Sequence, residues 1–442
     1  MRVLVVRRDN VGDLVCTTPL LRALRRGFPQ AWLGALVNSY NAPVLEGNSD
    51  LDAVMAYTKL KHLGAGEGAL SALGNGLAML WRLRRMHLDT VVLATPDFVP
   101  RLARLARWLA PRQVIGFSDG SPGALRMLDW SIPVARVHGL HEVERVFSLA
   151  AYFDLHGAPP PLRLAADPAQ VQKAARAFGT ATGPRVAIHI TARRPRQRWP
   201  AERFAQLIAQ LHAQHGAAAM LLWYPGARDD PRHPGDDDKA REVQQWLAGK
   251  VALAAYRTQT LPELIGALAA CDVVVTPDGG ALHLAAGLGK PTVALFGDSS
   301  PERWGPWGVP HRVLRPPSQN VSDLSVAKVG DAFTDLLREA VHVLVSTPGR
   351  RHRRLPAATG PQLPAARAAS LLAARHGLRR RLPPGGSAVG RLRAHRQSAA
   401  RVLRQPAHGA GHLEVEALLR HLPPPPRQIR RPLAAHHGDR RL

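Results

Sequence analysis

Cysteine is almost absent from this chain, which has only Cys16 and Cys271 among 442 residues. Neither belongs to a Cys-x-x-Cys pair or to the Cys/His spacing that binds zinc, so a cysteine-based metal site is not expected. Two isolated thiols fit a reducing compartment, and we expect a cytoplasmic protein. Long apolar runs are missing too, because no stretch of about twenty apolar residues occurs. The sequence therefore predicts that no segment spans a membrane.

The C-terminal end lacks lysine and aromatic residues. Residues 350–442 contain 20 Arg, 3 acidic residues and no Lys, Phe, Tyr or Trp, whereas the first 349 residues carry 39 basic and 30 acidic groups. Such a segment buries too little apolar surface to offset the entropy of ordering, so a disordered Arg/Pro-rich tail is predicted over 349–442. It could be an arm for anionic lipid, an arm for nucleic acid, or the out-of-frame translation of a GC-rich gene. The lack of lysine favours the third explanation.

The segment Thr276–Gly297, TPDGGALHLAAGLGKPTVALFG, has the pattern of a phosphate-binding turn. An acid and two glycines precede a short helix and an apolar strand, as in Rossmann-like folds that present helix amides to a phosphate. Asp278 precedes the helix, Gly279 and Gly280 let the backbone approach a ligand, and His283 follows one turn later. An ordinary strand, turn and helix is the alternative, and the segment alone does not decide.

An acidic residue follows the first apolar run. Residues 1–6 are predicted to form a buried strand, and a helix is predicted from Thr18, as N-cap, onward. Asp13 then lies on the connection, at the carboxyl edge of a parallel sheet, where ligands of open α/β sheets bind. A carboxylate there can accept a proton from a substrate hydroxyl. Alternatively, Asp13 caps the connection or pairs with Arg7 or Arg8.

Arginines gather between a predicted strand over 186–190 and a helix that begins after Trp199 and Pro200. Guanidinium groups match phosphate oxygens in bidentate pairs, so this loop is suited to a phosphate. For any one arginine, a solvated surface loop is the alternative. The arginines of this loop are Arg193, Arg194, Arg196 and Arg198.

Together, three segments resemble the signature regions of family 9 glycosyltransferases, the ADP-heptose:lipopolysaccharide heptosyltransferases. They are GDLVCTTPLLRALR, ARRPRQRWPAERFAQLI and TPDGGALHLAAGLGKPTVALFG, in the family's order and at its spacing. The resemblance spans roughly residues 1–345 and implies an α/β fold of GT-B architecture, with two Rossmann-like domains facing each other across a cleft. The acceptor is then bound mainly by the first domain and the nucleotide sugar by the second.

Strand-like and helical stretches alternate in both halves, as parallel sheets require. We expect an acceptor domain over 1–155, a linker over 156–183, a nucleotide-sugar domain over 184–348 and the basic tail over 349–442. The predicted strands include 32–37, 90–94, 113–117, 219–223 and 292–296, and the predicted helices include 69–86, 97–109, 238–247, 261–270 and 325–345.

The resemblance also implies roles for single residues. Asp13 matches the catalytic base, and Arg7, Asn10 and Gly12 beside it are predicted to contact the acceptor. The implied reaction is an inverting transfer of heptose from ADP-heptose to the inner core of lipopolysaccharide, with no metal or other cofactor. The predicted donor-binding residues are Thr191, Arg194, Arg196, Arg198, Asp278, Gly279, Gly280, Ala281 and His283.

Two positions depart from the family pattern. Asp278-Gly279-Gly280 stands where many relatives have Asp-Thr-Gly, so a hydroxyl that could bond a phosphate is absent and backbone amides must suffice. Gln197 stands where many have a lysine, which leaves one of the nearby arginines to offset the charge of the leaving ADP. These arginines are Arg194, Arg196 and Arg198.

Two further loops could border the donor. The connection after Trp223 could meet adenine and ribose, and the segment 297–308 could line the floor of the cleft. Exposed turns have the same composition, and a packed tryptophan is an equally good interpretation of Trp304. The residues concerned are Tyr224, Pro225 and Asp236 to Asp238 in the first loop, and Ser299, Ser300 and Trp304 in the second.

The implied acceptor is a lipid-linked oligosaccharide, so we expect a monomer that is peripheral to the inner face of the inner membrane and binds no nucleic acid. Alternatives from the same fold are a transferase or epimerase that uses another nucleotide sugar, or a sensor that binds the sugar without turnover. A basic nucleic-acid-binding protein is the alternative from another class. Its only support is the net charge of +26, most of which lies in the tail.

Overall fold

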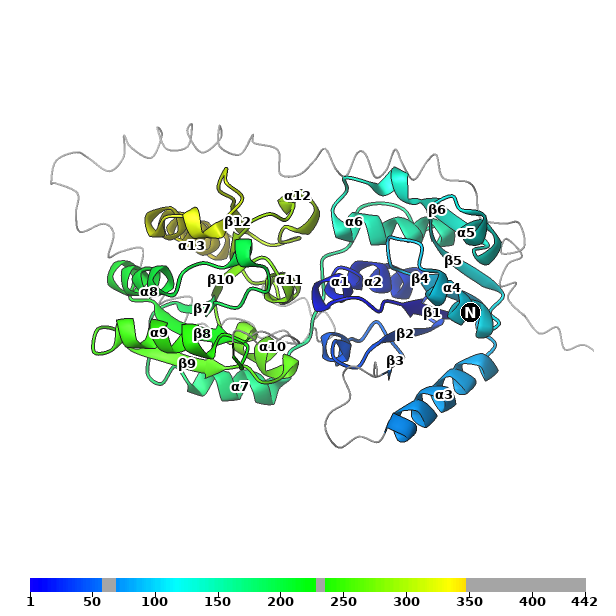
Figure 1. Ribbon diagram of the computed structural model, residues 1–442, viewed down its shortest axis with the longest axis horizontal. Coiled ribbons are helices and arrows are strands. Elements are labelled where there is room, and N and C mark those ends of the chain that lie inside the picture. The colour runs from blue at the N-terminus through cyan, green and yellow to red at the C-terminus, as the bar shows by residue number, and fades with distance from the viewer. Residues whose placement is uncertain (58–68, 228–234, 347–442) are drawn as a thin grey trace, which may run out of the picture.

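The two halves of the chain form two separate sheets that lie side by side (Figure 1). The computed structural model describes residues 1–57, 69–227 and 235–346, and the tail predicted over 349–442 lies outside the described residues. Within these ranges, no helix is long and apolar enough to cross a membrane.

The N-terminal half, blue to cyan in Figure 1, contains one parallel sheet with the strand order β3-β2-β1-β4-β5-β6. The central strand β1 is buried from its second residue onward, whereas the edge strand β3 is only half-buried. This is why an apolar run reveals β1 and not β3. The strands are β1 Arg2–Val6, β2 Trp32–Asn38, β3 Ala53–Tyr57, β4 Thr90–Leu93, β5 Gln113–Ser118 and β6 Trp130–Pro133.

Helices connect these strands, because parallel neighbours need a crossover. The helix predicted from Thr18 ends at Gly27, and its N-cap is Thr17, one residue earlier than predicted. The helices are α1 Val11–Val15, α2 Thr18–Gly27, α3 Ala69–Arg85, α4 Pro100–Trp108, α5 Pro122–Met127 and α6 Glu142–Phe147, with the 3₁₀ helices η1 Ala42–Leu45, η3 Val134–Val137 and η4 Ser148–Phe153.

The C-terminal half, green to yellow in Figure 1, repeats the plan with the strand order β12-β11-β10-β7-β8-β9, and again every pairing is parallel. Its strands are β7 Arg185–His189, β8 Ala218–Trp223, β9 Leu253–Arg257, β10 Val273–Pro277, β11 Thr292–Leu295 and β12 His311–Leu314. Its helices are η5 Pro195–Gln197, α8 Ala201–His215, α9 Asp237–Leu247, α10 Leu261–Ala269, α11 Gly280–Gly287, α12 Pro301–Trp304, η6 Val321–Asp323 and α13 Val326–Ser346.

The segment 156–183, predicted as a linker, contains helix α7 Pro168–Arg176. Asp167 caps this helix by accepting a hydrogen bond from Ala169 N at 2.9 Å. The helix packs against α10, and Lys173 Nζ lies 2.8 Å from Glu263 Oε1. The second part of the predicted linker is therefore a packed element of the C-terminal half.

The two halves meet where the helices that follow β1 and β10 pack together. Helix α1 lies against α11, and a Cβ placed on Gly280 would be 3.4 Å from Val11 Cβ. One buried apolar cluster crosses this contact and includes Val15 from the first half and Leu284 from the second. The contact brings the two segments singled out in the sequence, around Asp13 and around Asp278, to the same seam.

Gly266 permits the close crossing of α10 and α7. A Cβ at this position would lie 2.5 Å from Gln170 Cβ and 2.8 Å from the Gln170 carbonyl carbon, and the backbone of α7 has little room to move. We expect Gly266→Ala to destabilise the protein by about 1–3 kcal/mol through overpacking, as measured by urea unfolding.

Gly76 offers a matched control, because a Cβ there meets nothing within 4 Å in the described part of the chain. Gly76→Ala in α3 should be neutral or should stabilise by about 0.5–1 kcal/mol. Equal stability of the two variants would contradict this account of the α7–α10 crossing.

Candidate active site

Asp13 lies inside helix α1, although the sequence predicts an irregular connection there. Its Oδ2 accepts hydrogen bonds from Asn10 N at 2.9 Å and Asn10 Nδ2 at 3.0 Å. Its Oδ1 accepts a bond from Arg7. Both interactions of the purely structural alternative, a local cap and an arginine pair, are thus present, and they fix the direction of the carboxylate.

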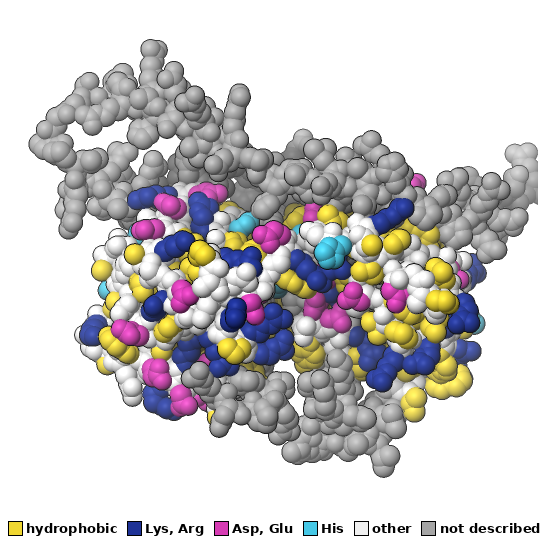
Figure 2. Space-filling model, turned by 45° about the horizontal axis from the view of Figure 1, so that its top comes forward, with side chains coloured by type: hydrophobic (Ala, Val, Ile, Leu, Met, Phe, Trp, Pro, Cys, Tyr) yellow, Lys and Arg dark blue, Asp and Glu magenta, His cyan; other side chains and the backbone are white. Residues whose placement is uncertain are grey.

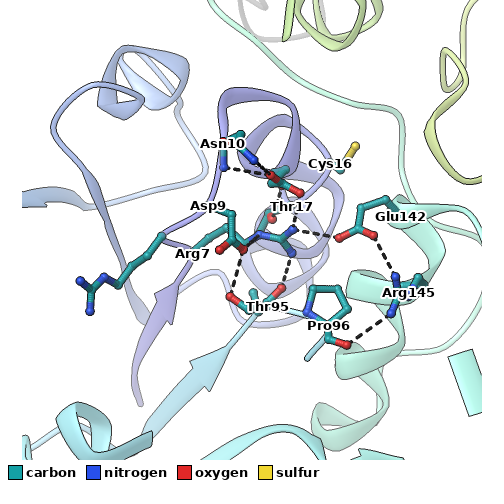
Figure 3. A network of polar contacts seen from close by, with 12 residues as sticks. Arg7, Asp9, Asn10, Cys16, Thr17, Thr95, Pro96, Glu142 and Arg145 are labelled. Atoms are coloured by element: carbon teal, nitrogen blue, oxygen red, sulfur yellow. Dashed lines mark hydrogen bonds and ion pairs between the residues drawn. The ribbon is translucent and has the colours of Figure 1, made fainter. Parts of the chain in front are cut away.

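Arg7 is the centre of the charged network drawn in Figure 3. Its Nη2 lies 2.9 Å from Asp13 Oδ1 and 2.8 Å from Glu142 Oε1. Its Nε lies 2.9 Å from Asp9 Oδ2, and its Nη1 donates to the carbonyl of Ala94. Arg7 is buried and pairs with three carboxylates, so its ion pair fixes the position of the Asp13 side chain.

The pKa values of Arg7 and Asp9 are both shifted in this network. Burial opposes the charge of Arg7, but the carboxylates of Asp13, Glu142 and Asp9 outweigh it and raise the pKa of the guanidinium. Burial also raises the pKa of the Asp9 carboxyl, and the charge of Asp13 adds to this effect. Arg7 and a 3.0 Å hydrogen bond from Thr95 Oγ1 oppose that rise.

Glu142 extends the network from one half of the molecule to the other. It is buried at the start of α6, and its Oε2 lies 3.3 Å from Arg145 Nη1. The same oxygen lies 3.2 Å from Nη2 of Arg303, which belongs to α12 of the C-terminal half. A continuous chain of ion pairs therefore runs from Asp13 through Arg7 and Glu142 to Arg303.

On the other side of the seam, Asp278 precedes α11 and is held by two neutral donors. Gln197 Nε2 donates to Asp278 Oδ2 at 2.9 Å, and Ser299 Oγ donates to the same oxygen at 2.6 Å. Gly279 is the N-cap of α11 and supplies no side-chain cap. The first amides of a helix have no partner within it, so those of Gly280 and Ala281 suit an anion.

His283, in α11, packs directly against Gly12 of the other half. A Cβ placed on Gly12 would lie 2.4 Å from His283 Cδ2, so only glycine fits at that position. The Sγ of Cys16 lies 3.7 Å from His283 Nδ1, and the ring of Trp304 meets the imidazole edge-on at 5.8 Å. His283 is therefore packed into the seam and is not open to solvent.

Both acids singled out in the sequence, Asp13 and Asp278, act on the pKa of His283. Burial lowers the pKa of the imidazole. The negative charges of Asp278, Asp13 and Glu142 oppose this shift, which means that all three lie close enough to act on it. Asp13, from the first half, and Asp278, from the second, thus both act on one buried ring.

The loop after β7 presents most of its arginines to solvent. Arg193, Arg194 and Arg196 are exposed, whereas Arg198 is half-buried and its Nε donates to the carbonyl of Ala192 at 2.9 Å. In Figure 2, Lys and Arg side chains of the C-terminal half lie next to Asp and Glu side chains of the N-terminal half near the middle of the molecule. The exposed arginines of this loop are thus open to an anion.

Two residues relate this loop to its surroundings. Thr191 Oγ1 accepts a 2.9 Å hydrogen bond from Tyr224 N, which leaves the hydroxyl proton able to reach a ligand. The pKa of Tyr40, in the N-terminal half, is raised to about 12 by burial and then by Asp13 and Asp9, while Arg193 opposes the rise. The charge of Arg193 in the C-terminal half therefore acts on the pKa of Tyr40 in the N-terminal half.

Several residues of this site escape the sequence analysis. Asp9 and Glu142 complete the Arg7 network, but Glu142 is 135 positions from Arg7 and carries no local signal. Gln197, noted only as a departure from the family pattern, proves to hold Asp278, and Ser299 does the same.

The other loop residues have structural contacts. Asp237 accepts bonds from Trp223 Nε1, Gly226 N and Arg257, and Ser300 caps α12. No group of three or more His, Cys, Asp or Glu side chains in the described part of the chain could hold a metal ion.

Known proteins share this sequence and fold. Lipopolysaccharide heptosyltransferase 2 of Escherichia coli strain K12 is 27% identical over 330 residues, which cover 71% of this chain and 88% of that protein. Lipopolysaccharide heptosyltransferase 3 of the same strain is 26% identical over 303 residues, covering 67% and 82%.

Among solved structures, the E. coli ADP-heptose lps heptosyltransferase II superposes with a TM-score of 0.62 at 21% identity, covering 77% of this chain and 99% of that one. The E. coli heptosyltransferase WaaC with ADP gives a TM-score of 0.61 at 22% identity, covering 76% and 100%.

Two parallel α/β halves that meet at an acid-and-glycine turn have the GT-B architecture that the resemblance implies. The model of glycosyltransferase family 9 (heptosyltransferase) matches residues 77–329. The chain belongs to glycosyltransferase family 9.

The buried position of Glu142 and the exposure of Arg303 predict unequal effects on stability. Glu142→Gln removes a buried charge with three arginine partners and should cost about 3–5 kcal/mol. Arg303 is 40% exposed, so Arg303→Gln should cost less than about 1 kcal/mol. Urea unfolding of both variants checks this, and a larger loss for Arg303→Gln would contradict the buried network.

Stability should also fall with acid because of His189, which lies at the end of β7. Burial, aided by Lys239, lowers its pKa to about 4. The unfolded chain binds more protons between the ordinary value and this one, so stability is lost as pH falls from about 6.5 to about 4, by at most about 1.4 kcal/mol per pH unit.

His189→Asn, which can keep the bond to Thr276 Oγ1, should flatten this fall in urea unfolding measured at a series of pH values. The same substitution at exposed His138 is the control. A steeper acid loss in His189→Asn would show that a buried neutral imidazole is not responsible.

Proposed function

We propose that this enzyme transfers heptose from ADP-heptose to the inner core of lipopolysaccharide, with inversion at the anomeric carbon and without a metal ion. The observation that carries the proposal is the packing of α1, which contains Asp13, on α11, which directly follows Asp278 and Gly279. Membership of family 9 supports it, as do relatives that are named lipopolysaccharide heptosyltransferases and a solved relative described with ADP.

Asp13 is the proposed general base. The bonds from Arg7 and Asn10 hold its carboxylate in one orientation, and the side chain remains partly exposed. It takes the proton of the acceptor hydroxyl as the oxygen attacks from the face opposite ADP. Arg7 then acts as a positioning residue beneath the base, while Asn10 and Gly12 border the acceptor side of the seam.

The leaving diphosphate is met by the turn at α11 and by the arginine loop. Amides of Gly279, Gly280 and Ala281 point along the positive end of the helix dipole, and they replace the hydroxyl that the glycine at position 279 lacks. Thr191 can donate its hydroxyl proton to a phosphate oxygen.

Two exposed arginines are proposed to take the place of the family's lysine. Gln197 binds Asp278 and Arg198 binds the carbonyl of Ala192, so neither is directed to a ligand. Arg194 and Arg196 are exposed, and Arg194 has only a 3.9 Å ion pair with Asp298 to give up. These two are therefore the proposed diphosphate ligands.

The acceptor is proposed to be a lipid-linked oligosaccharide at the inner face of the inner membrane, where a cytoplasmic monomer reaches it peripherally. The charge of the first 349 residues, with 39 basic and 30 acidic groups, favours approach to an anionic bilayer.

Asp13→Asn tests the proposed chemistry. Loss of the base should lower kcat for heptose transfer from ADP-heptose to a core-oligosaccharide acceptor by about 10²- to 10⁴-fold, because general-base catalysis contributes about that factor. The affinity for ADP-heptose, measured by calorimetry, should change little, since the donor is bound by the other half.

Asp9→Asn is the matched control, because Asp9 contacts the same guanidinium. It should retain far more activity than Asp13→Asn. Full activity in Asp13→Asn, or a larger loss in Asp9→Asn, would refute the role given to Asp13. Absence of transfer from ADP-heptose by the unaltered protein would refute the proposed reaction itself.

A further inference from the structure

Helices α3 and α4 carry an apolar surface that no described residue covers. Leu77 and Trp81 of α3 are 49% and 53% exposed, and Trp108 of α4 is 39% exposed. The rings of Trp81 and Trp108 meet edge-on at 5.8 Å, so the two helices present one continuous patch. In Figure 1, α3 lies on the outside of the N-terminal half, away from the seam.

The charge around this patch has one sign. Neither α3 nor α4 contains an Asp or Glu residue, and both are rich in arginine. On the exposed faces, four arginines form no ion pair with any other described residue, whereas Arg107 and Arg112 are paired with Asp129 and Asp89. The four unpaired side chains are Arg82 and Arg85 on α3, and Arg101 and Arg104 on α4.

Between the exposed side chains of α3 lies a groove of about 550 Å³. Arg82 and Arg85 line it together with Trp81, Ala78 and Met86, so two guanidinium groups stand beside an apolar wall. A guanidinium pair suits a phosphate, and the apolar side chains suit the hydrocarbon next to it.

We infer that the face formed by Leu77, Trp81, Trp108 and the four unpaired arginines binds the surface of a bilayer that contains anionic phospholipid. The name α3–α4 face is used for these seven residues. Interfacial aromatic rings with arginines around them are the composition that lies at the boundary of headgroups and acyl chains. An acidic protein partner would be drawn by the same charge, but it would not require exposed tryptophans beside the two guanidinium groups of the groove.

This inference deepens the proposed function and rests on it, because a lipid-linked acceptor must be reached at a membrane. The face belongs to the half that carries Asp13, so docking would hold that half next to the bilayer in which the proposed acceptor is anchored. No residue of the face belongs to the Arg7 network or to the turn at Asp278.

A single environment-sensitive label tests the face directly. Both native cysteines are buried, so Leu77→Cys in the full chain can be labelled with a nitrobenzoxadiazole dye. Upon addition of vesicles of phosphatidylcholine with phosphatidylglycerol, its emission should shift to shorter wavelength and gain intensity, and vesicles of phosphatidylcholine alone should have little effect.

Trp246→Cys with the same dye is the matched control. Trp246 is 45% exposed on α9 of the C-terminal half and, like the α3–α4 face, lies near a cation, with Lys250 Nζ 5.7 Å from its ring. It should not respond to either kind of vesicle. An unchanged label at position 77 on vesicle-bound protein would overturn the inference, and so would equal responses at both positions, which would indicate binding through other parts of the chain.

A kinetic measurement separates this inference from the proposed reaction. Arg82→Gln with Arg85→Gln should raise the KM for acceptor embedded in anionic vesicles by roughly fivefold per arginine, since each such charge contributes about 1 kcal/mol near an anionic surface. The same variant should keep its kcat and KM with a delipidated, soluble acceptor.

The two failures are distinguishable. Equal loss with both acceptors would overturn the membrane role, as would no change with either. Absence of transfer to the soluble acceptor by the unaltered protein would count against the proposed reaction, while the label at position 77 would still decide the bilayer contact.

Discussion

The arrangement of the site depends on one buried cation. Arg7 pairs with Asp9, Asp13 and Glu142 at once, and without it three buried or partly buried carboxylates would face one another with no positive charge between them. The same guanidinium aims Asp13 at the seam. Since Glu142 also pairs with Arg303, the orientation of Asp13 is tied to the position of the other half. A local ion pair thereby becomes a restraint on how the two halves fit together.

The two sides of the seam differ in charge. In the proposed reaction, the first half keeps negative charge at the place where a proton is accepted. The second half is proposed to receive a diphosphate, and there Asp278 is satisfied by the neutral donors Gln197 and Ser299, which leaves the helix amides and the exposed arginines to an anion. Because Gln197 is neutral, the positive charge of this loop lies outward, on the exposed side chains of Arg193, Arg194 and Arg196.

Much of the fold follows from local patterns, because the central strands are short apolar runs bounded by glycine, proline or polar residues. The architecture and the family are confirmed. Edge strands such as β3 and β9 are half exposed and lack that signal. In helix α7 the buried residue is Ala174, so the sequence of this helix shows no clear apolar face. The helix therefore fell within the segment predicted as a linker. Asp13 and the turn at Asp278 could be found from their motifs, but Glu142 joins them only through the packing of distant segments.

The fit between Gly12 and His283 has a thermodynamic side. The imidazole is sealed in a medium that disfavours its cationic form, although nearby carboxylates soften the penalty. If the two halves separated and water reached the His283 ring, the imidazole would regain its ordinary basicity. Separation of the halves would therefore be accompanied by proton uptake. Below the ordinary pKa of imidazole, a falling pH therefore opposes the packing of His283 between the two halves, and above that pKa this contribution no longer changes.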